Sequence, residues 1–167
     1  MSTETEPSAN VTIETTLNGT EVEQTVPAGT LLSAFLRNHE YLTGTHRGCE
    51  TAKCGACTVL VDGEPVKSCN LLAAQVDGSS ITTVEGLADG EELHPVQQAF
   101  WDCHGSQCGY CTPGFVTNAV ALLEDNPDPS VDEIQDHLAG NICRCTGYTK
   151  IIESVQEAGD RMDGDAP

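Results

Sequence analysis

The chain has 167 residues, which is enough for one good hydrophobic core or two small ones. Its 26 acidic residues against 7 basic ones give a net charge of −19, which excludes nucleic-acid binding because that function needs a basic surface. We interpret the acidic excess as a well-solvated surface and expect a halophilic source, since concentrated salt screens such self-repulsion. A partner with a basic face is the alternative interpretation.

Cysteine is the residue type whose use is unusual, with nine in the chain. Residues 1–10 are polar and lack the apolar run of a secretory signal, and no later run approaches the length of a membrane span. We therefore expect a cytoplasmic protein whose cysteines bind metal rather than form disulfides. The odd number of cysteines argues in the same direction.

The first expected elements are a β-hairpin and a short helix, after a disordered tail at residues 1–9. Residues 11–17 alternate between apolar and polar side chains, Asn18-Gly19 is a strong two-residue turn, and residues 21–26 return as a second strand. Thr30 is expected to cap the helix that follows. The apolar face of that helix holds Leu31, Leu32, Phe35 and Leu36.

The spacing C-x4-C-x2-C comes next and is typical of plant-type [2Fe–2S] proteins. Its three cysteines are Cys49, Cys54 and Cys57. A loop that curls around a cluster must aim backbone N–H groups at the sulfides of that cluster. Gly48 and Gly55 are expected to supply the positive φ angles that such a curl needs.

The following hairpin predicts a fourth thiol for this loop. Residues 58–61 are expected as a strand, Asp62-Gly63 as a turn and residues 64–70 as the returning strand. If residue 61 faces residue 64, Cys57 lies opposite Ser68, and Cys69 is within reach of the loop. A strand at residues 81–84 is expected to close the sheet of a ferredoxin-like domain that ends at about residue 85.

The second half of the chain predicts a small helical bundle after a linker at residues 86–90. Ser130 and Glu133 form a capping box, and Gly140 ends the helix that they begin. The four helical patterns cover residues 94–103, 113–124, 130–138 and 148–161.

Two cysteine pairs precede helices of this bundle. Cys108 and Cys111 stand before Thr112-Pro113, an expected N-cap and first helical residue, and Cys143 and Cys145 stand before the last helix. The positive end of a helix favours thiolate over thiol. Four thiolates are the number that holds an iron–sulfur cluster or a structural zinc.

Two alternatives remain open. The metal could be zinc instead of an iron–sulfur cluster, and a further cysteine could replace one of the ligands. A zinc site built from Cys54/Cys57 and Cys108/Cys111 would leave the other cysteines of both sets unexplained. Cys103 precedes Cys108 at the plant-type spacing, so by spacing alone it could replace a ligand of the last pair.

The remaining chemistry-bearing residues predict no active site in this chain. There is no Cys-x-His unit of a Rieske centre, no nucleophile motif and no dinucleotide-binding fingerprint. Substrate chemistry is therefore not expected here. The histidines are expected at surface, capping or interface positions, and they are His39, His46, His94, His104 and His137.

Three linked motifs carry a family resemblance, namely GCETAKCGACTV at residues 48–59, QCGYCTPG at 107–114 and GNICRCTGY at 140–148. The chain resembles the small iron–sulfur subunit of the molybdenum hydroxylases, the family of xanthine dehydrogenase, aldehyde oxidoreductase and aerobic carbon monoxide dehydrogenase. The resemblance covers roughly residues 10–160.

The resemblance implies an α+β protein with a β-grasp ferredoxin-like domain at residues 10–85, a four-helix domain at 86–162 and a tail at 163–167. Phe115 stands where the family often has Met, a bulk-conserving apolar change. Cys103 falls outside the family's ligand positions and is expected to be a spare thiol. Each domain would hold one [2Fe–2S] cluster, the first through Cys49, Cys54, Cys57 and Cys69 and the second through Cys108, Cys111, Cys143 and Cys145.

The resemblance also implies an oxidoreductase subunit that transfers electrons. Gln107 would hydrogen-bond a molybdenum–pterin cofactor on a large subunit, and the sulfur of Cys145 would approach the amino group of that pterin. Electrons would pass from molybdenum through the second and then the first cluster to FAD on a medium subunit.

The sequence HPVQQAFW at residues 94–101, together with residues 48–51, favours the carbon monoxide dehydrogenase-type branch of the family. The substrate site would lie on another subunit. A stand-alone ferredoxin-like electron carrier and a zinc-stabilised interaction module are the alternatives.

Overall fold

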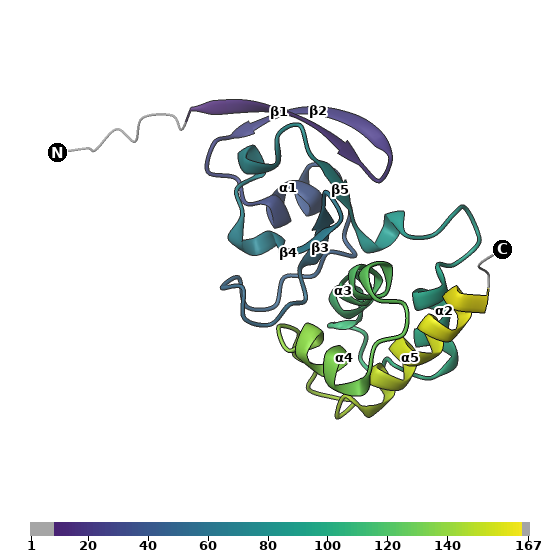
Figure 1. Ribbon diagram of the computed structural model, residues 1–167. Helices are drawn as coiled ribbons and strands as arrows, with labels where there is room; N and C mark the ends of the chain where they lie inside the picture. The colour runs from purple at the N-terminus through teal and green to yellow at the C-terminus, as the bar shows by residue number, and fades with distance from the viewer. Residues whose placement is uncertain (1–8, 165–167) are drawn as a thin grey trace.

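The computed structural model describes residues 9–164 and confirms the predicted α+β class. A β-sheet unit from the first half of the chain lies beside a unit of helices from the second half (Figure 1). The helix α3 (Thr112–Asp125) lies between the sheet and the other helices of that unit. Residues 1–8 of the predicted tail 1–9, and residues 165–167 of the predicted tail 163–167, lie outside the described residues.

The sheet has five strands, β1 (Asn10–Leu17), β2 (Thr20–Pro27), β3 (Thr58–Val61), β4 (Glu64–Lys67) and β5 (Ser80–Thr82). Their order is β2-β1-β5-β3-β4. β5 pairs in parallel with β1 and antiparallel with β3, so it joins two hairpins at the centre of the sheet. The strand predicted at residues 81–84 therefore exists, but it ends at Thr82, and Val84–Gly86 form a 3-10 turn.

Both predicted hairpins are confirmed. The φ angles are 49° and 78° at Asn18-Gly19 and 51° and 87° at Asp62-Gly63, the positive values that a type I′ turn requires. Across the second turn, Val61 pairs with Glu64 as predicted. Local turn chemistry therefore sets the register of the two strands that flank it.

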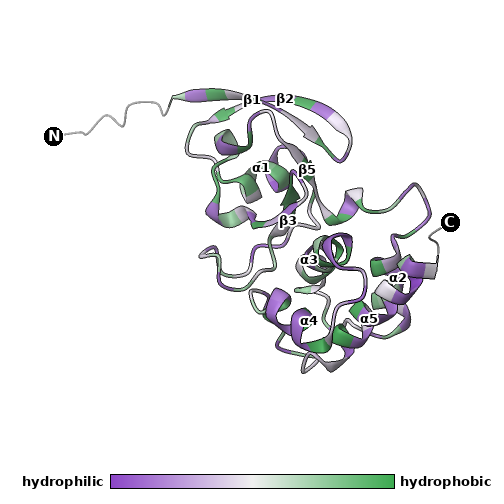
Figure 2. Ribbon diagram, viewed as in Figure 1, coloured by the Kyte–Doolittle hydropathy of each residue, from purple (hydrophilic) through white to green (hydrophobic). Residues whose placement is uncertain are grey.

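One hydrophobic core lies between the sheet and α1 (Leu32–Asn38). Phe35 of the helix and Ile13, Val59 and Ile81 of the sheet are fully buried in it. In Figure 2, hydrophobic and hydrophilic residues alternate along the β1–β2 hairpin, as expected for strands with one buried face.

The start of α1 differs from the prediction, because Thr30 does not cap it. The N-cap is Leu31, which makes no side-chain cap bond. The backbone of Leu31 instead forms an isolated antiparallel bridge with Leu72, and the carbonyl of Thr30 accepts the N–H of Ala73. A tertiary pairing thus positions the start of this helix.

The helical unit consists of α2 (Pro95–Asp102), α3 (Thr112–Asp125), α4 (Val131–Leu138) and α5 (Thr149–Gly164). The imidazole of His94 accepts the N–H of Val96 at the start of α2, which is a capping role. The capping box of Ser130 and Glu133 begins α4 as predicted. α5 continues past the predicted end at residue 161 and includes residues 163 and 164 of the predicted tail.

β3 contributes to two cores, because successive side chains of a strand point to opposite faces of the sheet. Val59 belongs to the core beneath α1, whereas Leu60 belongs to the core of the helical unit. The two units are therefore packed against each other through this strand. Within residues 9–164, no helix combines the length and the apolar character needed to cross a membrane.

Phe115 of α3 tests the packing of the helical core, because it is fully buried and meets Tyr148 edge to face with ring centroids 6.2 Å apart. We expect Phe115→Ala to lower the free energy of unfolding by about 3–5 kcal/mol, since it leaves a cavity. Phe115→Met keeps most of the volume and should cost less than about 1.5 kcal/mol. Denaturant unfolding of both variants measures these losses, and equal losses would contradict the packing role.

Candidate metal centres and the junction between them

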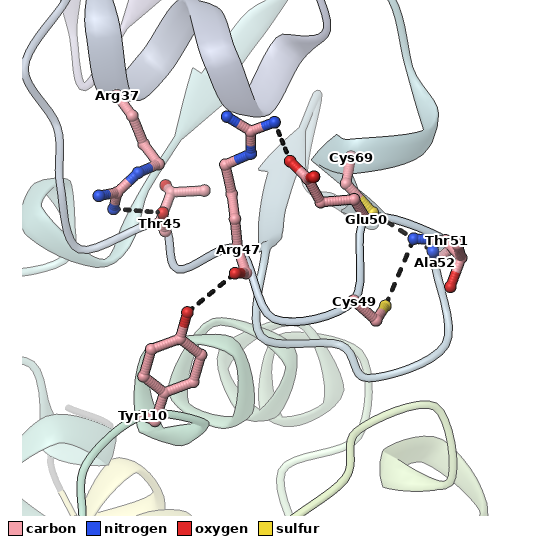
Figure 3. Close-up of polar contacts among 9 residues, drawn as sticks. All are labelled: Arg37, Thr45, Arg47, Cys49, Glu50, Thr51, Ala52, Cys69 and Tyr110. Carbon is pink, nitrogen blue, oxygen red and sulfur yellow. Dashed lines mark hydrogen bonds and ion pairs between the residues drawn. The ribbon is translucent and has the colours of Figure 1, made fainter.

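The loop between α1 and β3 aims backbone N–H groups at two thiols (Figure 3). The Sγ of Cys49 accepts the N–H groups of Thr51 at 3.4 Å and of Cys54 at 3.3 Å. The Sγ of Cys69 accepts the N–H of Ala52 at 3.3 Å. Hydrogen bonds of this kind stabilise a thiolate, so the loop fits the chemistry of a thiolate-bound metal centre.

Between Cys49 and Cys57, the curl of this loop uses positive φ at three positions, of which only one is glycine. The φ angles are 54° at Glu50, 57° at Ala52 and 73° at Gly55. The prediction for Gly55 is confirmed, but the prediction for Gly48 is wrong, because the φ angle of Gly48 is not positive. A Cβ on Gly48 would lie 3.0 Å from the Sγ of Cys54, so this glycine permits a close approach instead.

Cys57 and Cys69 form the buried part of the first set of thiols. Ser68 donates its N–H at 3.2 Å and its hydroxyl at 2.7 Å to the carbonyl of Cys57, so the predicted facing of these two residues is confirmed. β4 ends at Lys67, however, and Cys69 lies on a 3-10 turn at Ser68–Asn70 rather than on a longer strand. This turn brings the thiol of Cys69 to that of Cys57.

The thiols of the first set differ in acidity. Hydrogen bonds from Thr51 and Cys54 lower the pKa of Cys49 to about 6. Burial, reinforced by the neighbouring thiol of Cys57, raises the pKa of Cys69. A bound cation reverses such an increase, because a coordinating thiol is deprotonated outright.

The second set of thiols comes from the loops before α3 and α5. The Sγ of Cys143 accepts the N–H groups of Cys145 and Thr146, each at 3.4 Å, and lies 3.1 Å from the hydroxyl of Thr146. Cys111 meets Cys143, and Cys108 meets Cys145. The structure thus brings the two predicted pairs together, with each thiol of one loop facing a thiol of the other.

The start of α3 does not lower the pKa of its neighbouring thiol as predicted. Burial, followed by the thiol of Cys143, raises the pKa of Cys111 to about 12. Burial also opposes the ionisation of Cys143, but hydrogen bonds led by Thr146 hold the pKa of Cys143 below its ordinary value. The helix begins one residue earlier than predicted, at Thr112, with Cys111 as an N-cap that makes no side-chain bond.

The thiols of both sets approach one another in twos. Within residues 9–164, no group of three or more His, Cys, Asp or Glu side chains lies close enough to hold one metal ion. A [2Fe–2S] cluster takes two protein ligands on each iron, and thiols in pairs fit that requirement. Hydrogen-bond contact between thiols occurs in the pairs Cys49/Cys54, Cys57/Cys69, Cys111/Cys143 and Cys108/Cys145, and charge interactions also couple Cys69 to Cys49, Cys111 to Cys108 and Cys145 to Cys143.

The outer edge of the second set is open to a partner. Cys108 and Cys145 are exposed, and so is Gln107 on the same loop. Cys103 lies at the C-terminal cap of α2 and close to Lys150 of α5. In the described part of the chain, the backbone N–H bonds to sulfur do not involve Cys103.

A buried asparagine joins the two cysteine loops, and the sequence did not predict it. The amide of Asn141 donates to the carbonyl of Gly55 at 3.1 Å and accepts from the amide of Asn118 at 2.9 Å. The N–H of Ile142 donates to the carbonyl of Cys54 at 2.9 Å. Nothing in the sequence signalled this contact, because a single amide side chain creates no periodic pattern.

A second contact between the loops lies nearer the surface (Figure 3). The hydroxyl of Tyr110 donates to the carbonyl of Arg47 at 2.8 Å, and the carbonyl of Tyr110 lies 2.8 Å from Nδ1 of His46. The rings of His46 and Tyr110 stack with centroids 4.8 Å apart. His46 is therefore an interface residue, one of the roles expected for the histidines, and Arg47 forms an ion pair with Glu50 on its own loop.

Family models match both halves of the chain. Residues 15–88 match a 2Fe-2S iron-sulfur cluster binding domain, and residues 83–156 match a [2Fe-2S] binding domain.

Relatives of known function match nearly the whole chain. The nicotine 6-hydroxylase small subunit of Paenarthrobacter nicotinovorans is 51% identical over 152 residues, which cover 91% of this chain and 92% of that protein. The caffeine dehydrogenase subunit gamma of Pseudomonas sp. (strain CBB1) is 51% identical over 147 residues, which cover 86% of this chain and 88% of that protein. A chain in the crystal structure of quinoline 2-oxidoreductase from Pseudomonas putida 86 has a TM-score of 0.90 and 42% identity, covering 93% of this chain and 98% of that chain.

Gly114 tests the close approach of the two units, because a Cβ at this position would lie 2.2 Å from the carbonyl oxygen of Gly55. We expect Gly114→Ala to lower the free energy of unfolding by about 1–3 kcal/mol through overpacking. Gly29→Ala is the matched control, because a Cβ there meets no atom within 4 Å. The control should change stability by less than about 0.5 kcal/mol, and equal effects in denaturant unfolding would contradict the tight contact.

Proposed function

The chain belongs to the small iron–sulfur subunits of the molybdenum hydroxylase family, and from this premise we propose that it carries single electrons between two partner subunits. The electrons would come from a molybdenum–pterin centre on a large subunit and go to FAD on a medium subunit. As in the related complexes, the chain is a subunit of an oxidoreductase. We place the substrate site on the large subunit.

We propose that each half of the chain holds one [2Fe–2S] cluster, which when bound accepts and releases one electron. The approach of the thiols in pairs and the N–H groups aimed at Cys49, Cys69 and Cys143 support this assignment. The ligands would be Cys49, Cys54, Cys57 and Cys69 in the first centre and Cys108, Cys111, Cys143 and Cys145 in the second.

We further propose domain limits at residues 10–85 and 86–162. Two separate hydrophobic cores support a division of the chain near residue 85. The family models meet in the same region, since one ends at residue 88 and the other begins at residue 83.

The exposed edge of the second centre is the proposed entry point for electrons. Gln107 is exposed and can hydrogen-bond a pterin, and the exposed sulfur of Cys145 can approach the amino group of that pterin. The first centre would then be the exit towards FAD. An isolated ferredoxin-like carrier needs one cluster only, so the second set of thiols supports the relay over that alternative.

The substrate class of the complex is a separate proposal. The relatives named above are enzymes of nicotine, caffeine and quinoline, and they do not support the carbon monoxide dehydrogenase-type branch that the sequence favoured. We therefore propose a nitrogen heterocycle as the substrate and keep carbon monoxide as the second candidate, on the basis of residues 94–101. Electron transfer by the purified complex with each compound distinguishes the two.

Iron and acid-labile sulfide assays test the relay directly. We expect about four of each per chain, because two [2Fe–2S] clusters contain that number. Reduction should produce two distinct low-temperature EPR signals, and the tagged chain should copurify with molybdenum and FAD. A single zinc ion per chain, or one signal from a chain that purifies alone, would contradict the proposal.

Cysteine variants provide the control for this experiment. Cys143→Ser should remove one EPR signal and about half of the iron, since it deletes a ligand of one cluster. Cys103→Ser should leave both signals and the iron content unchanged. Loss of a signal in Cys103→Ser would instead make Cys103 a ligand.

We also propose adaptation to concentrated salt and a cytoplasmic location. No Asp, Glu, Lys or Arg is buried within residues 9–164, so the excess of acidic side chains lies where salt can screen it. None of the nine cysteines, all of which lie within residues 9–164, forms a disulfide, and this fits a reducing compartment.

Salt dependence of stability tests the first of these proposals. The temperature of thermal unfolding should rise steadily from low salt to molar KCl, because screening weakens the repulsion among acidic side chains in the folded state. An unchanged or falling temperature would leave the acidic excess as a solvated surface only.

A further inference from the structure

One backbone hydrogen bond links the two proposed centres. Its acceptor belongs to a ligand residue of the first centre, and its donor belongs to the neighbour of a ligand residue of the second centre. The carbonyl of Cys54 accepts the N–H of Ile142 at 2.9 Å, and Ile142 precedes Cys143 in the chain. A single hydrogen bond thus connects the backbone of the first cysteine set to that of the second. The contact of Tyr110 with Arg47 reaches the first loop two residues before Cys49 and so connects the sets less directly.

Asn141 holds this connection in place. Its side chain is 2% exposed, and it both donates to Gly55 and accepts from Asn118. The Asn118 amide also lies 3.3 Å from the carbonyl of His137, so the same network includes α3 and the end of α4. Asn is suited to this position because one short side chain supplies a donor and an acceptor at once.

We propose that Asn141 is a positioning residue for electron transfer between the two centres. By fixing the Cys54–Ile142 hydrogen bond, it sets the separation and the coupling of the two thiol quartets. The transfer moves one electron and no proton or bond: the centre of the helical unit is oxidised by one electron as the centre of the sheet unit is reduced. This inference rests on the proposed function, in which the molybdenum centre is the donor and FAD the acceptor.

The positioning role of Asn141 depends on its side-chain amide, as two substitutions illustrate. Asn141→Ala removes the one side-chain bond that reaches from the second cysteine loop to the carbonyl of Gly55, which then keeps only the N–H and hydroxyl of Thr58 from its own loop. The amide of Asn118 loses its acceptor on Asn141 and keeps the carbonyl of His137. Asn141→Asp keeps the shape and the acceptor for Asn118 but cannot donate to Gly55 when ionised. Both variants should therefore loosen the contact between the cysteine loops.

The experiment uses the complete complex with Asn141→Ala, and Ser130→Ala is the matched control. Ser130 caps α4 in the same helical unit, so its loss destabilises that unit without touching the bonds to Cys54 and Gly55. Three quantities are measured: hydrogen exchange of the peptide containing Ile142, the spin–spin interaction between the two reduced centres in EPR spectra, and the rate of electron transfer between them after rapid mixing with substrate.

In Asn141→Ala we expect both EPR signals to persist, the Ile142 amide to exchange faster, the spin–spin interaction to weaken and the transfer to slow severalfold. Ser130→Ala should lower the unfolding temperature and leave the interaction and the rate unchanged. If Asn141→Ala does not fold, Asn118→Ala is the milder variant, because it removes the bonds to Asn141 and to the carbonyl of His137 but keeps the bond from Asn141 to Gly55. It should shift the same three quantities in the same direction by less.

The inference would be overturned if Asn141→Ala folds and its Ile142 amide exchanges faster, but the spin–spin interaction and the transfer rate stay at the values of the unaltered complex. Equal changes in Ser130→Ala would overturn it too, since they would trace the effect to general destabilisation. An unaltered complex that lacks two EPR signals would overturn the proposed function itself, so the two failures are distinguishable.

Discussion

The absence of a side chain at Gly55 is the constraint on which the arrangement of the two units depends. A Cβ on Gly55 would lie 2.6 Å from the carbonyl of Gly140, and a Cβ on Gly114 would lie 2.2 Å from the carbonyl of Gly55. Backbone therefore meets backbone on both sides of one residue. The carbonyl of Gly55 that this contact buries accepts from Thr58 of its own loop and from Asn141 of the other loop. The cysteine loops can be close only because the chain has no side chains there.

Each set of thiols combines buried members with more exposed ones. In the first set, the thiols of Cys57 and Cys69 are buried and hold the loop against the hairpin, while Cys49 lies nearer the surface with N–H donors that favour its ionised form. In the second set, Cys143 is buried and Cys145 is exposed. This gradient suits the proposed electron relay, because a centre that is shielded from water on one side can still come close to a partner on the other.

The strand β3 connects the two small hydrophobic cores, because it contributes a side chain to each. β3 presents Val59 to the core of the sheet unit and Leu60 to the core of the helical unit, so neither unit could move away without exposing an apolar side chain. Cys57 directly precedes this strand and Cys54 carries the bond to Ile142. The position of the first thiol set is thus coupled to the packing of both units.

Local sequence determined the hairpins at Asn18-Gly19 and Asp62-Gly63, the capping box at Ser130 and the facing of Cys57 and Ser68, because each depends on residues close together in the chain. Tertiary structure alone decided the central place of β5, the bridge that replaces a cap at Thr30 and the raised pKa of Cys111. It also decided the bond between Asn141 and Gly55, which are 86 residues apart. Contacts of this range depend on how finished elements pack, and no spacing or period in the sequence records that packing.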